Sequence, residues 1–157
     1  MPGDVTAVLG APGSGKTSVA ATLLSRLPRH VVLDWDAFME PAGALAGRDV
    51  RRLPELWPAY RQLLRSVLEA VSAAPVVMLG VSTPDEVAGW PIDAWLLLDC
   101  DDGERRRRLR GRSTPVEIEA AVADPAAYRS LGLRRIDTTD RAVEEVADEI
   151  AGAVARH

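Results

Sequence analysis

Hydrophobic and polar positions follow two different periods along this chain. Short runs of consecutive apolar residues, typical of strands buried on both faces, alternate with longer segments whose apolar residues lie three or four positions apart, as in helices. The apolar runs cover residues 5–9, 31–33, 75–81, 94–98 and, more weakly, 133–136. The helical patterns cover residues 16–27, 37–46, 51–73, 102–111, 115–123 and 140–155. This alternation predicts an α/β fold in which helices cover both faces of a parallel sheet.

The pattern is continuous from end to end. It contains no internal repeat, linker or low-complexity segment, so residues 1–157 are expected to form a single domain. Pro54 fits the first turn of the helical pattern over 51–73, whereas Pro58 should kink that helix or move its start.

The first apolar run ends in a glycine-rich segment of defined spacing. Residues 10–17 read Gly-Ala-Pro-Gly-Ser-Gly-Lys-Thr and match G-x-x-x-x-G-K-[ST] at every fixed position, between a strand and a helix. The glycines let backbone N–H groups turn toward phosphate oxygens, and the following helix favours an anion at its N-terminus. Agreement of every fixed position and of the context disfavours an ordinary glycine-rich turn. The segment predicts a site for a nucleotide triphosphate, with these contacts: Gly10, Gly13, Ser14, Gly15, Lys16, Thr17 and Ser18.

Within this segment, two side chains have assigned chemistry. Lys16, the one lysine among 19 basic residues, is expected to reach the β- and γ-phosphates as a catalytic cation. The Thr17 hydroxyl is expected to be a ligand of Mg²⁺.

Two carboxylates follow the second apolar run. Asp34 and Asp36 flank Trp35, and alternation along an extended chain aims both acids to one side and the indole to the other. In a parallel sheet this position lies beyond the carboxyl ends of the strands, where ligands bind. One acid could hold Mg²⁺ through water and the other could accept a proton from a substrate hydroxyl. We assign Asp36 as the base and Asp34 to the metal side; the alternative is that one of them caps the next helix.

A further acid, Asp99, ends the fourth apolar run and is a rival metal ligand. The third run has no acid at its end, which counts against an ATPase or GTPase that carries its acid on that strand.

Arginines are concentrated in residues 105–112. The segment is open to three interpretations: a solvated helix with Glu104–Arg108 support, an RNA-contacting patch, or a set of arginines that reach a transferring phosphate. The segment has no lysine and no interleaved aromatic residues, which weakens the interpretation as an RNA-contacting patch. Arg108 and Arg112 lie four positions apart on one helical face, so they could act together, and we expect about two of these arginines to be functional and the rest to be solvated.

Composition narrows the class of protein. A formal charge of −4 argues against a general nucleic-acid binder, and no apolar run approaches the length of a membrane span. The N-terminus has no basic segment typical of a secretory signal. Cys100 is the one cysteine, which excludes an intrachain disulfide and a cysteine zinc cluster. The expected compartment is the cytoplasm.

Together, the phosphate loop, the Asp-x-Asp pair and the segment Leu98-Asp99…Arg108-Leu109-x-Gly111-Arg112 resemble the adenylate-kinase-like branch of P-loop kinases. That branch includes nucleoside monophosphate kinases, shikimate and gluconate kinases and chloramphenicol phosphotransferase. The resemblance covers nearly the whole chain by order of elements, and its most specific motif is the phosphate loop. It implies a three-layer P-loop NTPase fold, with a five-stranded parallel sheet whose central strand carries the loop, and ATP with Mg²⁺ as the bound groups.

The resemblance also implies roles for residues outside the loop. Residues 111–129 would form a short lid, residues 138–141 would cradle adenine, and residues 37–73 would hold the acceptor. The implied contacts are Arg108, Arg112 and Arg129 with the reacting phosphates, Arg108, Thr139 and Arg141 with the nucleotide, and Asp36, Arg52, Trp57 and Arg61 with the acceptor. Trp57 and Tyr60 are nevertheless aromatic residues of a kind more often found in cores or interfaces.

One departure from the kinase pattern bears on the acceptor. Nucleoside monophosphate kinases carry a G-[FY]-P-R segment after the third strand, and residues 80–84 here read Gly-Val-Ser-Thr-Pro, without the arginine. A nucleoside monophosphate acceptor is therefore disfavoured, and a metabolite or an antibiotic hydroxyl remains open.

The sequence thus predicts an ATP-dependent kinase of a small acceptor. The main alternative is a nucleotide-dependent regulatory or binding ATPase without such an acceptor. A kinase of nucleic-acid 5′-hydroxyl ends is a third possibility, which the acidic composition disfavours.

Overall fold

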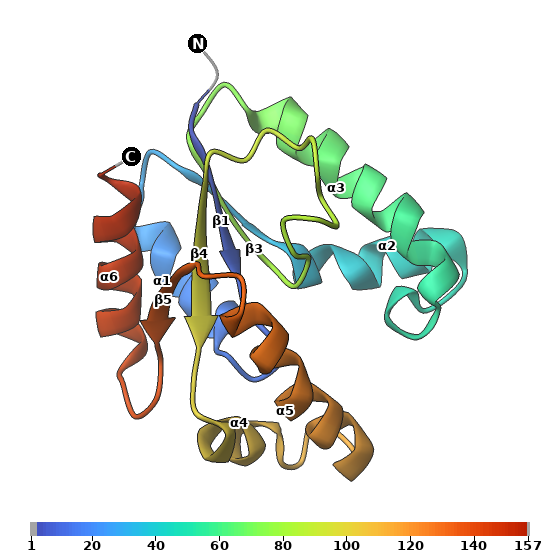
Figure 1. Cartoon of the computed structure of the whole chain (residues 1–157). Helices are drawn as coiled ribbons and strands as arrows, with labels where there is room; N and C mark the ends of the chain where they lie inside the picture. Colours follow the sequence, from blue (N-terminus) through green and yellow to red (C-terminus); the bar gives the residue numbers. More distant parts are fainter. Residues whose placement is uncertain (1–2, 157) are drawn as a thin grey trace.

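A computed structural model describes residues 3–156 of the chain, so the ends of the expected domain, residues 1–2 and 157, lie outside the described part. Its central layer is a five-stranded sheet in the order β2-β3-β1-β4-β5, with every neighbouring pair parallel (Figure 1). The strands are β1 (Val5–Leu9), β2 (Val31–Asp34), β3 (Val76–Gly80), β4 (Ala94–Asp99) and β5 (Arg134–Asp137). The predicted sheet and the central place of the strand before the phosphate loop are confirmed.

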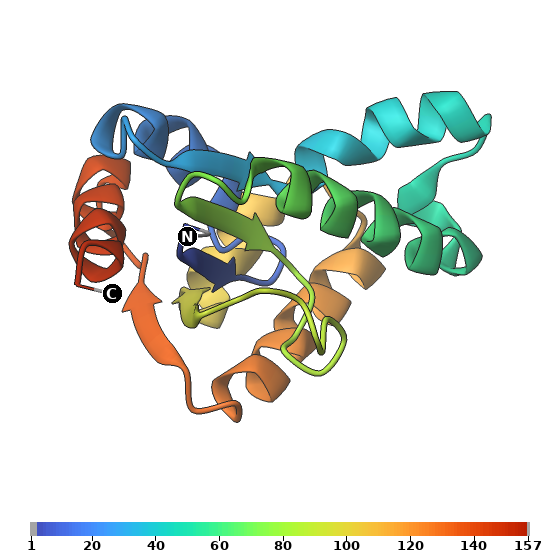
Figure 2. The same cartoon turned by 90° about the horizontal axis from the view of Figure 1, so that it is seen from above.

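Helices cover both faces of this sheet, as Figure 2 shows from above. The α-helices are α1 (Lys16–Arg26), α2 (Met39–Ala46), α3 (Trp57–Val71), α4 (Asp102–Leu109), α5 (Pro115–Arg129) and α6 (Val143–Val154). Three short 3₁₀ helices connect the second strand to α3: η1 (Trp35–Phe38), η2 (Val50–Arg52) and η3 (Pro54–Leu56). No helix among residues 3–156 combines the length and the apolar character that a membrane crossing requires.

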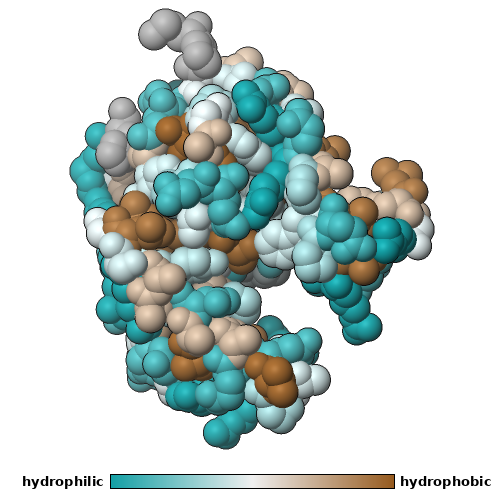
Figure 3. Space-filling view, turned by 45° about the vertical axis from the view of Figure 1, so that its right-hand side comes forward, coloured by the Kyte–Doolittle hydropathy of each residue, from teal (hydrophilic) through white to brown (hydrophobic). Residues whose placement is uncertain are grey.

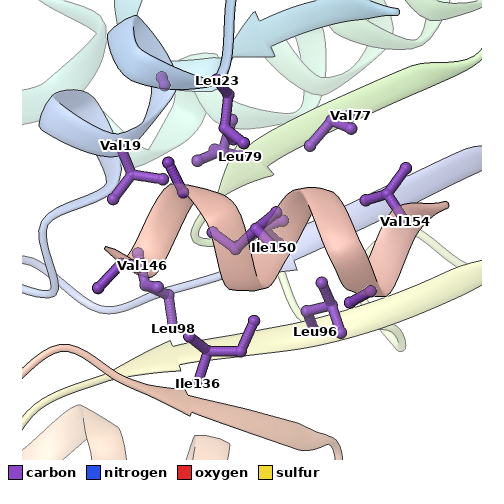
Figure 4. Packing of buried hydrophobic residues seen from close by; sticks show 14 of the residues in the cluster. Val19, Leu23, Val77, Leu79, Leu96, Leu98, Ile136, Val146, Ile150 and Val154 are labelled. Carbon is purple, nitrogen blue, oxygen red and sulfur yellow. The ribbon is translucent and has the colours of Figure 1, made fainter. Parts of the chain in front are cut away.

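One face of the sheet is covered by α1 and α6. In Figure 4, Val146, Ile150 and Val154 of α6 lie over side chains from β4, β5 and α1. Leu23 and Ile150 are fully buried in this cluster, as their helical spacing predicted. The packing fixes α1, and with it the helix terminus that the phosphate loop opens.

The opposite face is covered by η1, α2, α3 and the connection between β3 and β4. Trp35 lies at its centre, stacked on Trp90 at 5.9 Å between ring centroids and edge-on to Tyr60 at 5.7 Å. Trp35 is 1% exposed, so the residue between the two acids turns into the core. Tyr60 is also buried, and its hydroxyl donates to the Trp35 carbonyl.

Two helix boundaries differ from the sequence pattern. Pro58 lies in the first turn of α3, so this helix begins at Trp57 and the residues before it form η2 and η3, which is the displaced start that Pro58 predicted. Helix α5 continues to Arg129 instead of ending near residue 123, although it contains Pro125. Pro125 is buried, so the apolar contact of its ring compensates for the missing amide hydrogen bond.

Candidate functional site

A cavity of about 440 Å³ opens at the N-terminus of α1. Its wall combines the phosphate loop, η1, the end of α4 and the connection between β5 and α6. The lining residues are Pro12, Gly13, Ser14, Gly15, Lys16, Thr17, Ser18, Val19, Asp36, Arg108, Leu109, Arg112, Thr138, Arg141, Val143 and Val146. Most of the nucleotide contacts expected from the sequence therefore face one space.

Three glycines give the loop its shape. Gly13 and Gly15 have φ angles of 80° and 97°, in the left-handed region that side chains with a Cβ rarely adopt. Gly10 is constrained by space instead, because a Cβ there would lie 2.5 Å from Ser14 Oγ and 3.2 Å from the Leu98 carbonyl oxygen. Gly10 therefore shapes the loop from behind and does not line the cavity.

The loop leaves a row of backbone donors unused. Five backbone N–H groups of the loop and the first turn of α1 have no acceptor within residues 3–156. They belong to Gly13, Gly15, Lys16, Thr17 and Ser18. The Ser14 N–H, by contrast, is used in a turn to the Ala11 carbonyl at 3.1 Å. Unused N–H groups at a helix N-terminus form a site for an anion. The arrangement fits a chain of phosphate groups.

Lys16 is almost completely enclosed by the loop. Its Nζ donates to the Gly10 carbonyl at 2.6 Å and to the Ala11 carbonyl at 3.2 Å, and the residue is 5% exposed. Burial lowers the pKa of this ammonium from its usual range, and the nearby Asp36 and Asp34 carboxylates oppose part of that shift. Lys16 is thus a desolvated cation beside the unused N–H groups.

The two acids after β2 have different surroundings. Asp34 accepts the Asp36 N–H at 3.0 Å and so caps η1, which is the alternative role considered for one of the pair. Asp34 also lines a shallow hollow together with Thr17, the other residue assigned to the metal. Asp36 lines the main cavity with Lys16. The two acids therefore lie on different surfaces, and their assignment as base and metal-side acid stays a prediction.

Arg108 connects the phosphate loop to the opposite wall. Its Nη1 donates to the Gly13 carbonyl at 3.2 Å and to Thr138 Oγ1 at 2.9 Å, and its Nη2 donates to the Thr138 carbonyl at 2.8 Å. Glu104 orients the guanidinium by accepting its Nε at 2.6 Å. Arg108 therefore braces the space between the loop and the connection that follows β5.

The other predicted nucleotide contacts are distributed around the cavity. Arg112 is exposed, lines the cavity and has no ion pair among the described residues. Arg141 also lines it, with its Nη1 on Glu149 Oε2 at 2.7 Å. Thr139 turns away and accepts the Asp101 N–H at 2.9 Å, while its neighbour Thr138 takes the place on the wall.

Asp99 is the centre of an ion-pair cluster. It is 1% exposed, accepts Arg105 Nη2 and Arg129 Nε at 2.7 Å each, and forms an ion pair with Arg135, whose Nε lies 3.1 Å away. The rival interpretation of Asp99 as a metal ligand thus gives way to a carboxylate occupied by three arginines. Arg129 lies in this cluster and not on the cavity wall, so its closure onto the reaction stays a prediction.

Sequence reasoning missed Arg105, which is fully buried under the phosphate loop. In the sequence it is one of several adjacent arginines that were expected to be solvated. A signal was available in the spacing, since Arg105 precedes Arg108 by three positions and lies on the same helical face. The arginines between them, Arg106 and Arg107, have side chains 42% and 66% exposed.

On the acceptor side, the residues expected from the sequence have other partners. Arg52 pairs with Asp49 at 3.4 Å, Arg61 pairs with Glu86 at 2.7 Å, and the Trp57 indole donates to the Val50 carbonyl at 3.1 Å. Arg61 also lies over the Trp57 ring, at 5.7 Å from its centroid.

Arg51 is the arginine of this segment that approaches the acids. Its Nη2 lies 3.4 Å from the Asp36 carbonyl oxygen, and it has no ion pair within the part of the chain that the structure describes. Figure 3 shows the surface hollowed between the part that carries α2 and the lobe of α4 and α5. Asp36 lies in η1, the short helix that leads into α2.

Comparison with known proteins places the fold. A profile of the family described as AAA domain matches residues 7–125. No curated protein matches the chain. Several solved structures match it over nearly their full lengths, among them the following three. The tunicamycin resistance protein of Deinococcus radiodurans is 21% identical, with a TM-score of 0.70 over 97% of this chain and 95% of that one.

The other two structures are described as kinases. Shikimate kinase from Acinetobacter baumannii is 18% identical, with a TM-score of 0.69 over 98% of this chain and 94% of that one. A gluconokinase from Sinorhizobium meliloti is 18% identical, with a TM-score of 0.62 over 99% and 93%. At these identities the likeness is one of fold, and it confirms the expected resemblance to P-loop kinases at that level.

Proposed function

The chain belongs to the AAA domain family, and from this premise we propose that it is an ATP-dependent kinase that transfers the γ-phosphoryl group to a hydroxyl or phosphate of a small acceptor. One observation carries the proposal: the unused N–H groups of the phosphate loop, the Lys16 ammonium and the Asp36 carboxylate all belong to the wall of one cavity. These are the groups that bind a triphosphate and take a proton from an acceptor.

The site fits a nucleotide with Mg²⁺. A row of free N–H donors and a buried cation match the charge of the phosphates, and Thr17 with Asp34 offers two oxygen ligands at one edge. Within residues 3–156, no cluster of three or more His, Cys, Asp or Glu side chains stands ready to hold a metal ion. A nucleotide-bound Mg²⁺ takes most of its ligands from phosphates and water, and it would neutralise charge on the β- and γ-phosphate oxygens.

In the proposed reaction the protein mainly positions the reacting groups and neutralises the negative charge of the phosphates. Lys16 exchanges its loop carbonyls for phosphate oxygens, and Arg112 adds a second cation from the facing wall. With a hydroxyl acceptor, Asp36 takes the proton as the acceptor oxygen bonds to the γ-phosphorus. The bond from that phosphorus to the bridging oxygen breaks, and ADP leaves with the electron pair.

The comparisons support small molecules as acceptors without naming one. The neighbouring structures are described as a shikimate kinase, a gluconokinase and a tunicamycin resistance protein. Residues Val81 and Ser82 follow β3, where nucleoside monophosphate kinases carry an aromatic residue, proline and arginine. We therefore favour a hydroxylated metabolite or antibiotic over a nucleoside monophosphate.

A γ-labelled ATP transfer screen tests the proposal. The pure protein with Mg²⁺ is incubated with nucleosides, monophosphates, sugars, shikimate-like acids and hydroxylated antibiotics, and GTP replaces ATP in a parallel series. We expect one class of acceptor to become labelled. Nucleotide binding without a labelled acceptor, together with nucleotide-dependent capture of a protein partner, would instead support a regulatory ATPase.

A further inference from the structure

The phosphate loop rests on a buried arginine that faces away from the cavity. Arg105 of α4 donates from Nη1 to the Pro12 carbonyl at 2.6 Å and from Nη2 to Asp99 Oδ1 at 2.7 Å. It is fully buried and does not line the cavity. Its position under the loop separates it from Lys16, Arg108 and Arg112, which do line the cavity.

We propose that Arg105 is a positioning residue for the phosphate loop, which aims the Gly13 N–H at the nucleotide by holding the Pro12 carbonyl on the opposite side. The proposal rests on the proposed nucleotide site. A trans peptide is planar, so its C=O and N–H groups point in opposite directions. No cis peptide bond occurs among residues 3–156. Fixing the Pro12 oxygen on Arg105 therefore fixes the direction of the Gly13 N–H, which no described acceptor uses.

The loop and the arginine are fitted to each other at close range. A Cβ on Gly13 would lie 3.0 Å from Arg105 Cγ and 3.2 Å from Leu109 Cγ. The absence of a side chain at this position thus allows the loop to lie directly on the arginine stem. The next carbonyl, of Gly13, is held in the same way by Arg108 Nη1 at 3.2 Å. Two arginines one turn apart therefore hold two successive loop carbonyls.

Asp99 sets the orientation of Arg105 and does not depend on it. The Asp99 carboxylate also accepts Arg129 Nε at 2.7 Å and forms an ion pair with Arg135 Nε at 3.1 Å, so it remains paired when Arg105 is replaced. The Arg105 Nε is buried and has no hydrogen-bond partner among residues 3–156, and an apolar side chain of similar length carries no such unpaired donor. Removing one member of a buried ion pair is strongly destabilising when it leaves the other charge unpaired, and here Arg129 and Arg135 keep the Asp99 charge compensated. A substitution of Arg105 can therefore alter the geometry of the phosphate loop without a large change in the stability of the fold.

The test compares Arg105→Met with Arg106→Met, an exposed cation of the same helix that pairs with Glu119 at 3.2 Å. Calorimetric titration measures the Kd for ATP, ADP and AMP, each with Mg²⁺, and thermal unfolding measures Tm. We expect Arg105→Met to weaken ATP binding about tenfold, ADP binding less and AMP binding little, with Tm close to that of Arg106→Met. Arg105→Lys, which can reach Pro12 or Asp99, should recover part of the ATP affinity.

Each other outcome overturns the proposal in a recognisable way. Equal ATP affinity in Arg105→Met and wild type would show that the loop keeps its shape without Arg105. An equal loss for all three nucleotides with a lowered Tm would assign Arg105 to stability alone. If Arg105→Met does not fold, Arg105→Lys with wild-type ATP affinity would reject the positioning role. If the wild-type chain binds none of the three nucleotides, the proposed function itself is refuted.

Discussion

Lys16→Met removes one charge from the phosphate loop while keeping most of the side-chain length. In the structure the ammonium is 5% exposed and is held by the Gly10 and Ala11 carbonyls at 2.6 and 3.2 Å. The two carbonyls thus hold the ammonium group that must contact phosphate in the proposed reaction. We predict that the substitution abolishes phosphoryl transfer and leaves the fold intact.

The stability of the Lys16→Met chain follows from two opposing contributions. Two hydrogen bonds from a charged donor contribute about 1.5–3 kcal/mol each. Enclosing an ammonium costs several kcal/mol in lost hydration, and the lowered pKa of Lys16 shows that burial outweighs the attraction of Asp36 and Asp34. The free energy of unfolding should therefore stay within about 1 kcal/mol of the wild-type value.

Transfer should be affected far more than stability. Loss of one preorganised donor to a developing charge typically lowers kcat by about 10²–10³-fold. Because Lys16 also contacts phosphate in the ground state of the proposed complex, the affinity for ATP should fall as well. The measurements are single-turnover transfer from γ-labelled ATP and calorimetric titration with ATP.

Lys16 should also give stability a characteristic pH dependence. Its pKa in the unfolded chain is the ordinary value near 10.5, and burial lowers it in the folded chain. Between the two pKa values the unfolded chain binds more protons, so the unfolding free energy of wild type should rise with pH relative to Lys16→Met. Denaturant unfolding of both chains at neutral and mildly alkaline pH measures this difference.

Arg26→Met provides a control on the same helix, since Arg26 pairs with Asp148 at 2.6 Å at the far end of α1. It should transfer phosphate at the wild-type rate. The reasoning fails if Lys16→Met transfers normally. It also fails if the variant loses more than about 3 kcal/mol of stability, because Lys16 would then act as a structural ion.

The other predictions concern the base, the acceptor and the loop. Asp36→Asn should lose transfer by at least about 10²-fold while binding ATP·Mg²⁺ normally, and a normal rate would remove Asp36 as the base. Arg51→Ala should raise KM for the acceptor and leave KM for ATP unchanged, whereas the exposed, paired Arg52→Ala should change neither; equal effects of the two would show that Arg51 has no special place. Gly10→Ala should cost about 1–3 kcal/mol because its Cβ would meet Ser14 Oγ at 2.5 Å. Gly152→Ala, in the open interior of α6, should instead stabilise the chain by about 0.5–1 kcal/mol in thermal unfolding.

The sequence predicted the parts of the site that depend on local spacing. The loop from Gly10 to Thr17 was recognised from the residue types at eight consecutive positions. The strand and the helix around it were predicted from the hydrophobic periods. Trp35 was expected on the side opposite the acids, and it is buried, although Trp35 and Asp36 lie in η1 and not in an extended strand. In each case the determining interactions lie within a few residues of one another in the chain.

The partners of the charged side chains could not be predicted in the same way. Asp99 meets arginines from α4, α5 and β5, and Arg61 meets Glu86, 25 positions away. Such pairs form only after the elements have packed, so a strand-ending acid looks the same in the sequence whether it binds metal or arginine. Helical phase was the remaining local signal, and it separates buried Arg105 from exposed Arg106 and Arg107.

The contacts of the loop indicate how little must change when phosphate binds. Arg105, which lies outside the cavity, holds the Pro12 carbonyl, and Arg108 at the cavity wall holds the Gly13 carbonyl, so the directions of the N–H groups that follow these carbonyls are fixed. Lys16 bonds to two loop carbonyls that it must leave when it contacts phosphate, whereas Arg108 and Thr138 can keep their bonds to the Gly13 and Ser14 carbonyls. Reorganisation on binding is then confined largely to one side chain, and the free energy of phosphate contact is not consumed in ordering the backbone. A loop held in this way favours the triphosphate through preorganisation as well as through charge.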